Sequence, residues 1–309
     1  MNLFIQLLLV FFLLIFQFIL IVNENNAVAE SFNFAAVGDW GDNSETIKTA
    51  QNIDTKNVEV VLGLGDYAYE KNSNGIRSWW NNIEMVHDDE IFKGALGNAE
   101  VDDDFDENMY LELFNQSSWT HSFVYNGVLF VAINTEEDTS DEQKEKVIDM
   151  LKNSTEVDWK VVFFHRPILT SKTDNKPDPD IGVFAEKYCP VFKEYNVNLV
   201  LQAHNHNYQR SYVLDCSNNE FVKSEDSEGF TIANVGTGGR MLESQHVLEG
   251  MSPLMVTQCD DRIGFLNVDV VNKTQMKVQF IDNNGKIADT FEINKGNPVM
   301  NDITSRSCI

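Results

Sequence analysis

An apolar run that ends in a turn with polar, ligand-type side chains occupies residues 60–69, with the sequence VVLGLGDYAY. Aliphatic and β-branched residues in such a run are typical of a buried strand in a parallel sheet. The turn that follows carries Asp66 and Tyr69, and open α/β sheets place their chemistry at this end of a strand. Glycine and aspartate also favour turns for purely conformational reasons. The stretch therefore predicts either an ordinary turn or one part of a site whose other residues lie elsewhere in the chain.

Four further apolar runs end in the same way. Asp39 follows the run at 32–37, Asn98 follows 91–96, His165 follows 159–164, and His204 and His206 follow 197–202. Singly, each has a structural interpretation: an aspartate before a helix is a common cap, and a lone histidine is often a core residue. Chance does not readily place a ligand-type residue after every run. We therefore interpret these strand ends together as one site.

The residues at the strand ends comprise carboxylates, an amide, imidazoles and a phenol. They are Asp39, Asp66, Tyr69, Asn98, His165, His204 and His206. Oxygen and nitrogen donors of this kind suit two hard or borderline transition ions that share Asp66, and they do not suit a thiolate site. Two ions ~3.5–4 Å apart can hold a phosphoryl oxygen, orient an ester for in-line attack and lower the pKa of a bound water.

The spacing of the runs predicts an α/β fold built from βαβ units. Helical patterns follow the strands at residues 43–53, 76–86, 141–151 and 183–195, and Asn126-Gly127 predicts a hairpin between strands at 119–125 and 128–134. Further strands are expected at 230–235, 263–271 and 276–281, with a turn at 283–285 before a last strand.

The N-terminal residues are almost wholly apolar as far as Val22, and Ala27-Val28-Ala29 follows. This pattern predicts a secretory signal peptide at 1–29, with cleavage before Glu30. An uncleaved membrane anchor is the alternative, because no Lys or Arg precedes the run and about 20 apolar residues span a bilayer. Either way we expect a secreted protein, or one held at the outer face of the membrane, with one domain at 30–309.

Net charge limits the possible binding partners, and the cysteines predict disulfides. The formal net charge of −25 argues against nucleic acid and anionic membrane surfaces as partners. Four cysteines without CxxC spacing in an exported chain predict two disulfides, with three possible connectivities. We favour Cys189 with Cys216 and Cys259 with Cys308.

The ordered blocks GDWG, GDYAY, GNAE, FFHRP and AHNHNY resemble the signature blocks of the calcineurin-like metallophosphoesterases. The tyrosine after the second aspartate is similar to that of purple acid phosphatases, and the resemblance covers residues 32–239. The resemblance implies a two-sheet β sandwich flanked by helices. It also implies a secreted acid phosphatase that acts on small phosphate esters and hydrolyses phosphomonoesters with hydroxide bound at a dinuclear metal centre. It further implies Fe³⁺ on one ligand group and a divalent Fe, Zn or Mn ion on the other, with Asp66 shared. The first group is Asp39, Tyr69 and His206; the second is Asn98, His165 and His204.

The third block departs from the family pattern, which has histidine where this chain has Ala99. That histidine stabilises the transition state or protonates the leaving group, and losing a general acid costs about 10²–10⁴ in rate for poor leaving groups. We predict Asp66, His204 and Glu100 as catalytic residues, with Glu100 in the role of the missing acid and His87 or His121 as alternatives.

Two arginines, Arg166 and Arg240, are candidates for contact with substrate oxygens, although Arg166 suits a salt bridge equally well. Two other functions remain open. One is a phosphodiesterase or nucleotidase that uses the same centre. The other is a non-catalytic surface protein that binds metal and phosphate, which the alanine at position 99 suggests.

Overall fold

The computed structural model describes residues 31–69, 73–87, 91–101, 107–136, 138–171, 179–225, 228–242 and 253–296. Its helices are α2 (Ser44–Asp54), α3 (Ser73–Asn82), α4 (Glu107–Leu113), α5 (Asp141–Asn153) and α6 (Pro179–Glu194), with short 3₁₀ turns η1 (Glu84–Val86) and η2 (Asn98–Glu100). Its strands are β1 (Phe32–Val37), β2 (Val60–Gly63), β3 (Ile91–Gly94), β4 (His121–Tyr125), β5 (Val128–Ala132), β6 (Trp159–Phe163), β7 (Leu199–Gln202), β8 (Tyr208–Ser211), β9 (Leu214–Ser217), β10 (Glu220–Lys223), β11 (Thr231–Val235), β12 (Met255–Cys259), β13 (Gly264–Asn272), β14 (Gln275–Asp282) and β15 (Ile287–Asn294).

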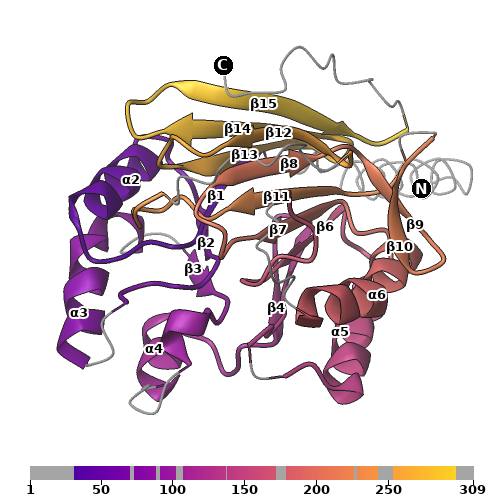
Figure 1. The fold of residues 1–309 in the computed structure, drawn as a ribbon, viewed down its shortest axis with the longest axis horizontal. Helices are drawn as coiled ribbons and strands as arrows, with labels where there is room; N and C mark the ends of the chain where they lie inside the picture. Colours follow the sequence, from indigo (N-terminus) through magenta and orange to yellow (C-terminus); the bar gives the residue numbers. More distant parts are fainter. Residues whose placement is uncertain are drawn as a thin grey trace, which may run out of the picture. The chain divides into compact units, whose positions relative to one another are not determined.

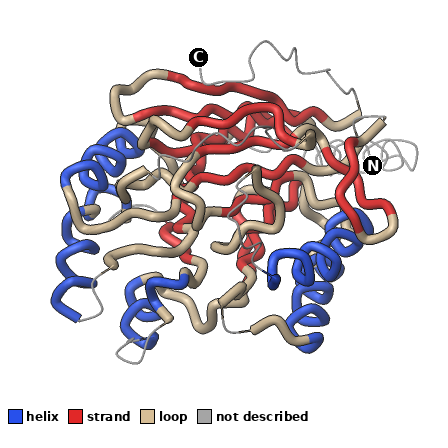
Figure 2. The backbone as a smooth tube through the Cα atoms, viewed as in Figure 1, coloured by secondary structure: helices blue, strands red, loops and turns tan. Residues whose placement is uncertain are grey.

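Two mixed sheets form the centre of the fold (Figures 1 and 2). One has six strands in the order β15-β14-β13-β1-β2-β3, and the other has seven in the order β12-β8-β11-β7-β6-β5-β4. β1, β2 and β3 run parallel to one another, as do β5, β6, β7 and β11. The carboxyl ends of these parallel strands carry the ligand-type residues of the sequence.

The core lies between the sheets and also under the helices, because the strand period of two sends alternate residues to opposite faces. In β5, Val128 and Phe130 join the cluster that both sheets share, and Leu129 and Val131 join a second cluster. Phe34 of β1 meets Phe130 edge-on across the sandwich, with ring centroids 5.2 Å apart. Helices α2 and α3 lie on one side and α5 and α6 on the other (Figure 1). The predicted two-sheet β sandwich flanked by helices is confirmed.

Local signals in the sequence mark several element boundaries. β1 spans the predicted 32–37, and α2 begins after Asn43, whose side chain accepts hydrogen bonds from the next turn as an N-cap does. Asn126 and Gly127 take φ of 41° and 77°, as the hairpin turn between β4 and β5 requires. The helix predicted at 76–86 is instead α3 followed by η1. The sequence interpretation missed α4, β8, β9, β10 and β12.

The predicted Cys189–Cys216 disulfide is present and ties α6 to β9, with 5.6 Å between the Cα atoms. Cys308 of the second predicted pair lies outside the described residues, as do residues 1–29 with the signal peptide or anchor. Among the helices that the structure describes, none has the length and apolar character needed to span a membrane.

Candidate metal centre

The loops after β1, β2, β3, β6 and β7 meet at the carboxyl ends of the parallel strands. Backbone hydrogen bonds hold these loops together: the amide of Asp39 donates to the carbonyl of Gly65 (3.0 Å), and the amide of Ala203 donates to the carbonyl of His165 (2.9 Å). The seven predicted ligands all come from these loops. They fall into two groups of side chains around Asp66.

The first group comprises Asp39, Tyr69 and His206. The Tyr69 hydroxyl lies 3.1 Å from Asp39 Oδ1 and 3.3 Å from His206 Nε2. His206 Nε2 lies 3.2 Å from the same Asp39 oxygen. Atoms that share one cation at about 2.1 Å are roughly 3 Å apart, so this triangle has the size of a ligand set.

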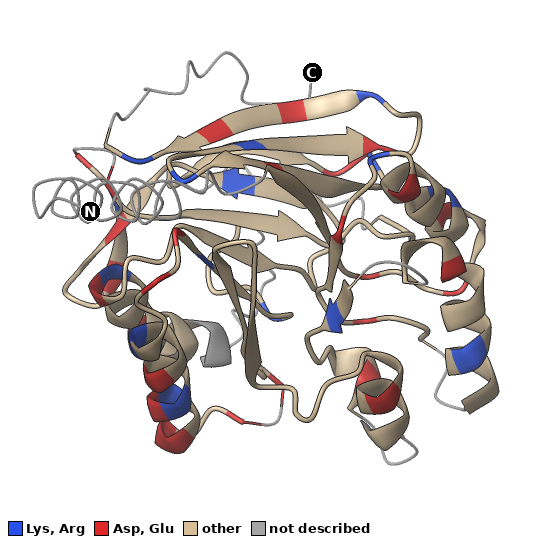
Figure 3. Cartoon of the chain, turned by 180° about the vertical axis from the view of Figure 1, so that it is seen from behind, with Lys and Arg blue, Asp and Glu red and all other residues tan. Residues whose placement is uncertain are grey.

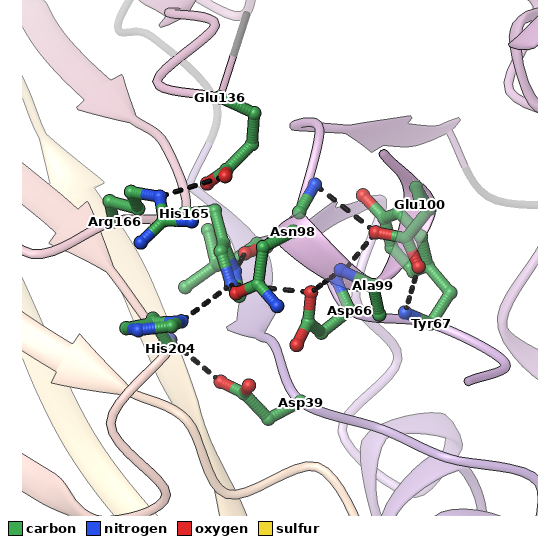
Figure 4. A network of polar contacts seen from close by, with 12 residues as sticks. Asp39, Asp66, Tyr67, Asn98, Ala99, Glu100, Glu136, His165, Arg166 and His204 are labelled. Carbon is green, nitrogen blue, oxygen red and sulfur yellow. Dashed lines mark hydrogen bonds and ion pairs between the residues drawn. The ribbon is translucent and has the colours of Figure 1, made fainter. Parts of the chain in front are cut away.

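The second group comprises Asn98, His165 and His204, next to Asp66 (Figure 4). His165 Nε2 lies 3.1 Å from Asn98 Oδ1, 3.3 Å from Asp66 Oδ1 and 3.3 Å from His204 Nδ1. The amide of His204 donates to Asp39 Oδ2 at 2.8 Å, which links the two groups. Ligand atoms of Asp39, Asp66 and His165 all lie within 4.8 Å of one another, and all three residues are buried.

Two of the three histidines, His165 and His206, present a nitrogen lone pair to this cluster. Nδ1 of His165 donates to the carbonyl of Leu64 (2.8 Å), and Nδ1 of His206 donates to the carbonyl of Met241 (3.1 Å), because a carbonyl only accepts. In the neutral tautomer that these bonds select, Nε2 of His165 is an acceptor that faces the oxygens of Asn98 and Asp66. Nε2 of His206 is an acceptor that faces Asp39 Oδ1 and the Tyr69 hydroxyl. A proton on Nε2 or a metal ion resolves that arrangement, and backbone carbonyls that fix the other ring nitrogen are usual for metal-bound histidine. The residues present therefore fit metal ions.

Electrostatics at the cluster point the same way. Burial opposes a charge on His165, but Asp66, Asp39 and Glu136 outweigh it and raise its pKa to about 9. Burial and the carboxylates of Asp39 and Asp66 raise the pKa of the Tyr69 phenol far above its ordinary range. The cluster thus attracts positive charge, and Tyr69 can ionise only next to a cation that is acidic enough to displace its proton.

Four of these residues have left-handed backbone conformations, which are uncommon outside glycine. Asp39, Asp66, Tyr69 and His204 have φ of 56°, 55°, 56° and 69°. Two glycines leave room for the ligands. A Cβ on Gly97 would lie 2.4 Å from Asp66 Oδ1, and a Cβ on Gly236 would lie 2.6 Å from Asp39 Oδ2. The conformations that the loops adopt thus serve the placing of side chains.

Glu100 lies behind Asp66, on the side opposite His204 (Figure 4). Its buried carboxylate accepts three backbone N–H groups, from Asp66 (2.9 Å), Tyr67 (2.8 Å) and Gly97 (3.1 Å). Burial, and then the charge of Asp66, raise the pKa of Glu100 to about 8. These contacts are those of a residue that positions the Asp66 loop. The predicted role of Glu100 as proton donor stays a prediction.

The two alternative proton donors, His87 and His121, contact residues outside the two ligand groups. His87 stacks on Trp80, with ring centroids 3.7 Å apart, and its Nε2 lies 2.9 Å from the carbonyl of Trp80. His121 donates from Nδ1 to the carbonyl of Ser118 at 3.0 Å, and burial lowers its pKa to about 4. These contacts hold both rings to their own segments.

Glu136 is a site residue that the sequence interpretation missed. Its buried carboxylate accepts Arg166 Nε at 2.8 Å, next to His165, and burial raises its pKa although His165 and Arg166 oppose the shift (Figure 4). The rule that found the other residues would have found it, because the apolar run of β5 also ends shortly before Glu136. Arg166 therefore forms the salt bridge that its sequence context allowed.

The fold and the cluster define an α/β sandwich with a candidate metal centre, and comparison with known proteins gives its family. The family model for calcineurin-like phosphoesterases matches residues 32–208, more than half of the chain. The chain belongs to the calcineurin-like phosphoesterase family. Membership supports hydrolysis of phosphate esters at a metal site formed around Asp39, Asp66 and His165.

Individual relatives are distant. A stretch of 63 residues is 35% identical to an uncharacterized protein of Mycobacterium tuberculosis, over 20% of this chain and 12% of that protein. The purple acid phosphatase from yellow lupin (Lupinus luteus) seeds has a similar structure, with a TM-score of 0.69 and 18% identity over 86% of this chain and 54% of that one. This chain therefore spans about half of the lupin protein.

Two further solved structures share the fold. GAP50, described as the anchor in the inner membrane complex of Plasmodium, has a TM-score of 0.64 and 16% identity over 85% of this chain and 89% of its own. PhoD has a TM-score of 0.62 and 16% identity over 86% of this chain and 70% of its own. At these identities the likeness establishes the architecture.

Proposed function

We propose that the protein is a phosphomonoesterase of the acid phosphatase type that uses two metal ions. The observation that carries the proposal is the pair of ligand groups around Asp66, each with a histidine whose Nε2 lies next to a carboxylate oxygen. Metal ions held there would supply Lewis acidity for a phosphoryl group and would make hydroxide available near neutral pH.

In this proposal the two ligand groups hold different ions. Asp39, Tyr69 and His206 would hold Fe³⁺, for which a phenolate is a suitable ligand, and Asp66 would serve both ions. The second ion is a divalent Fe, Zn or Mn ion. Its ligands are Asn98, His165 and His204. The Asp66 carboxylate is fixed for this task by the amide of Ala99, which donates to Oδ1 at 2.8 Å.

The side chain at position 99 shapes the choice of substrate. Ala99 has a methyl group that cannot donate a proton, and the neighbouring carboxylate of Glu100 is engaged by backbone amides. Esters whose leaving group needs a proton should therefore react slowly, and aryl phosphates, whose leaving groups are stable as anions, should react faster. We further propose that residues 1–29 direct export and that residues 30–309 form the phosphatase domain.

The test is to purify the protein, determine bound metals by elemental analysis, and measure hydrolysis of p-nitrophenyl phosphate before and after chelation. We expect iron with a second metal, a visible tyrosinate-to-iron absorption band, and hydrolysis that chelation abolishes. Bis-p-nitrophenyl phosphate is the control substrate, because a faster rate on this diester would favour a phosphodiesterase. A protein without the absorption band and without metal-dependent hydrolysis would refute the proposal.

A second candidate is a non-catalytic protein that binds metal and phosphate at the cell surface. The alanine at position 99 favours it, and the same fold occurs in GAP50, which is described as an anchor. Calorimetry separates the two candidates. Tight binding of inorganic phosphate to the metal-loaded protein, with no hydrolysis of any ester, would support this alternative and exclude the phosphatase.

A further inference from the structure

Arg240 lies over a residue of the metal centre. It follows the glycine turn at 236–239, and its backbone amide donates to the carbonyl of Asp39 at 2.9 Å. Its guanidinium carbon stands 4.3 Å from the ring centroid of Tyr69, within the range of a cation–π contact. Arg240 is exposed, so this charge lies between a ligand residue and solvent.

Three other arginines of the fold are paired with carboxylates. Arg166 donates from Nε to Glu136 at 2.8 Å, Arg210 donates from Nε to Asp289 at 2.6 Å, and Arg262 donates from Nη1 to Asp282 at 3.0 Å. Within the described ranges Arg240 forms no such pair, and its guanidinium contacts the Tyr69 ring. Its positive charge therefore lies at the candidate centre, outside any ion pair among the described residues.

The rest of the chain makes that charge unusual. Asp and Glu number 48 against 23 Lys and Arg, and acidic positions recur over the helices in the view of Figure 3. The field of such a protein repels anions, so an anionic substrate needs local positive charge where it binds. Arg240 supplies that charge together with the planar N–H fork that matches two phosphate oxygens.

We propose that Arg240 binds the phosphoryl group of the substrate and makes the site select phosphomonoesters over phosphodiesters. This inference rests on the proposed function of the same site. A monoester carries close to two negative charges at neutral pH and has three terminal oxygens, whereas a diester carries about one charge on two. A guanidinium beside the metal centre therefore stabilises the bound monoester more.

Arg240 is held in place before substrate arrives. Its backbone is fixed to Asp39, its side chain packs on Tyr69, and the next residue, Met241, accepts the Nδ1–H of His206 through its carbonyl. Arg240 thus contacts the first ligand group through its backbone and its side chain, and Met241, the residue after it, contacts the same group. Little side-chain freedom is lost on binding, which favours affinity.

The experiment compares Arg240→Ala and Arg240→Lys with the metal-loaded wild-type protein on p-nitrophenyl phosphate and bis-p-nitrophenyl phosphate. Loss of one charged hydrogen-bonding group predicts that Arg240→Ala raises KM for the monoester about 10-fold to 100-fold, with a smaller change in kcat and in diester hydrolysis. Arg240→Lys should recover part of the affinity. Arg77→Ala is the matched control, because it removes the same charge from an exposed position on α3.

Calorimetry with inorganic phosphate separates this inference from the proposed function. Phosphate should bind the metal-loaded wild-type and Arg77→Ala proteins alike and bind Arg240→Ala about 10-fold or more weakly. If phosphate binding follows this pattern but the protein hydrolyses no ester, Arg240 still binds phosphate. The selection of monoesters by Arg240 and the proposed phosphatase activity would then both be overturned. Equal phosphate binding by all three proteins, equal losses on monoester and diester, or no phosphate binding by the wild type would each overturn the inference.

Discussion

Glu100→Gln tests whether Glu100 positions the Asp66 loop or supplies a proton. The carboxylate oxygens accept three buried N–H groups: Oε2 accepts those of Asp66 and Gly97, and Oε1 accepts that of Tyr67. Glutamine has nearly the same shape, but one of its two terminal groups only donates. Protonation of Glu100 itself is a milder change, because a hydroxyl oxygen still accepts. The comparison of Glu100 with glutamine therefore holds at pH values below and above the raised pKa of Glu100.

The expected magnitude follows from these contacts. In its best orientation the glutamine keeps its oxygen on the amides of Asp66 and Gly97 and turns its amino group toward the amide of Tyr67. One buried donor then has no acceptor, which costs about 1–3 kcal/mol of the free energy of unfolding. Because whole domains have about 5–15 kcal/mol, this loss is readily measured.

Urea denaturation and elemental analysis of the purified variant are the assays. We expect a lower unfolding midpoint and a lower metal content, with activity on every ester reduced in step with the metal. Glu59→Gln is the control, because among the described residues the Glu59 side chain accepts only the amide of Asn33, at 2.8 Å, and glutamine keeps that acceptor. Normal stability and metal content, with slower turnover on alkyl phosphates alone, would refute our reading and identify Glu100 as the proton donor.

Three further predictions concern single side chains. Asp39→Ala and His206→Ala should each lose one of the two metal ions, and a variant that keeps both, by elemental analysis, would contradict the ligand assignment. Ala99→His should raise the rate on glycerol phosphate relative to p-nitrophenyl phosphate, up to about 10²-fold, because it adds a proton donor; an unchanged ratio of rates would count against that role. Burial lowers the pKa of His121 from 6.5 to about 4, so only the unfolded chain gains a proton between these values and stability falls as the pH drops through them. His121→Phe should remove up to about 3 kcal/mol of this loss between pH 7 and pH 4, and equal pH dependence of the two proteins in urea would exclude the mechanism.

The parallel strands and the residues after them were predictable because these strands consist mainly of apolar residues, although β3 and β6 each contain one partly exposed lysine. Runs such as that of β2, buried at every position, stand out from the polar segments around them. The chain then places its functional groups immediately after the run. The ligand-type residues could therefore be found by position alone, without knowledge of the pairing of strands.

β8 was missed because its composition is polar although every residue in it is buried. Arg210 pairs with Asp289 of β15, and Gln209 accepts the amide of Ser171. Partners this far apart in the chain cannot be read from a local pattern. The same limit applies to Glu100, whose neighbours in the sequence do not reveal that it accepts amides of residues 66 and 67.

The left-handed conformations of Asp39, Asp66, Tyr69 and His204 set stability against function. Each costs an L-residue on the order of 1–3 kcal/mol, and least for aspartate. Glycine at any of these positions would relieve the strain and would remove the candidate metal-binding atom that the strained backbone positions. Glycine at Asp39 or Asp66 would also leave the amide of His204 or Ala99 without its acceptor, so selection for heat resistance alone would meet two opposing effects at these two positions.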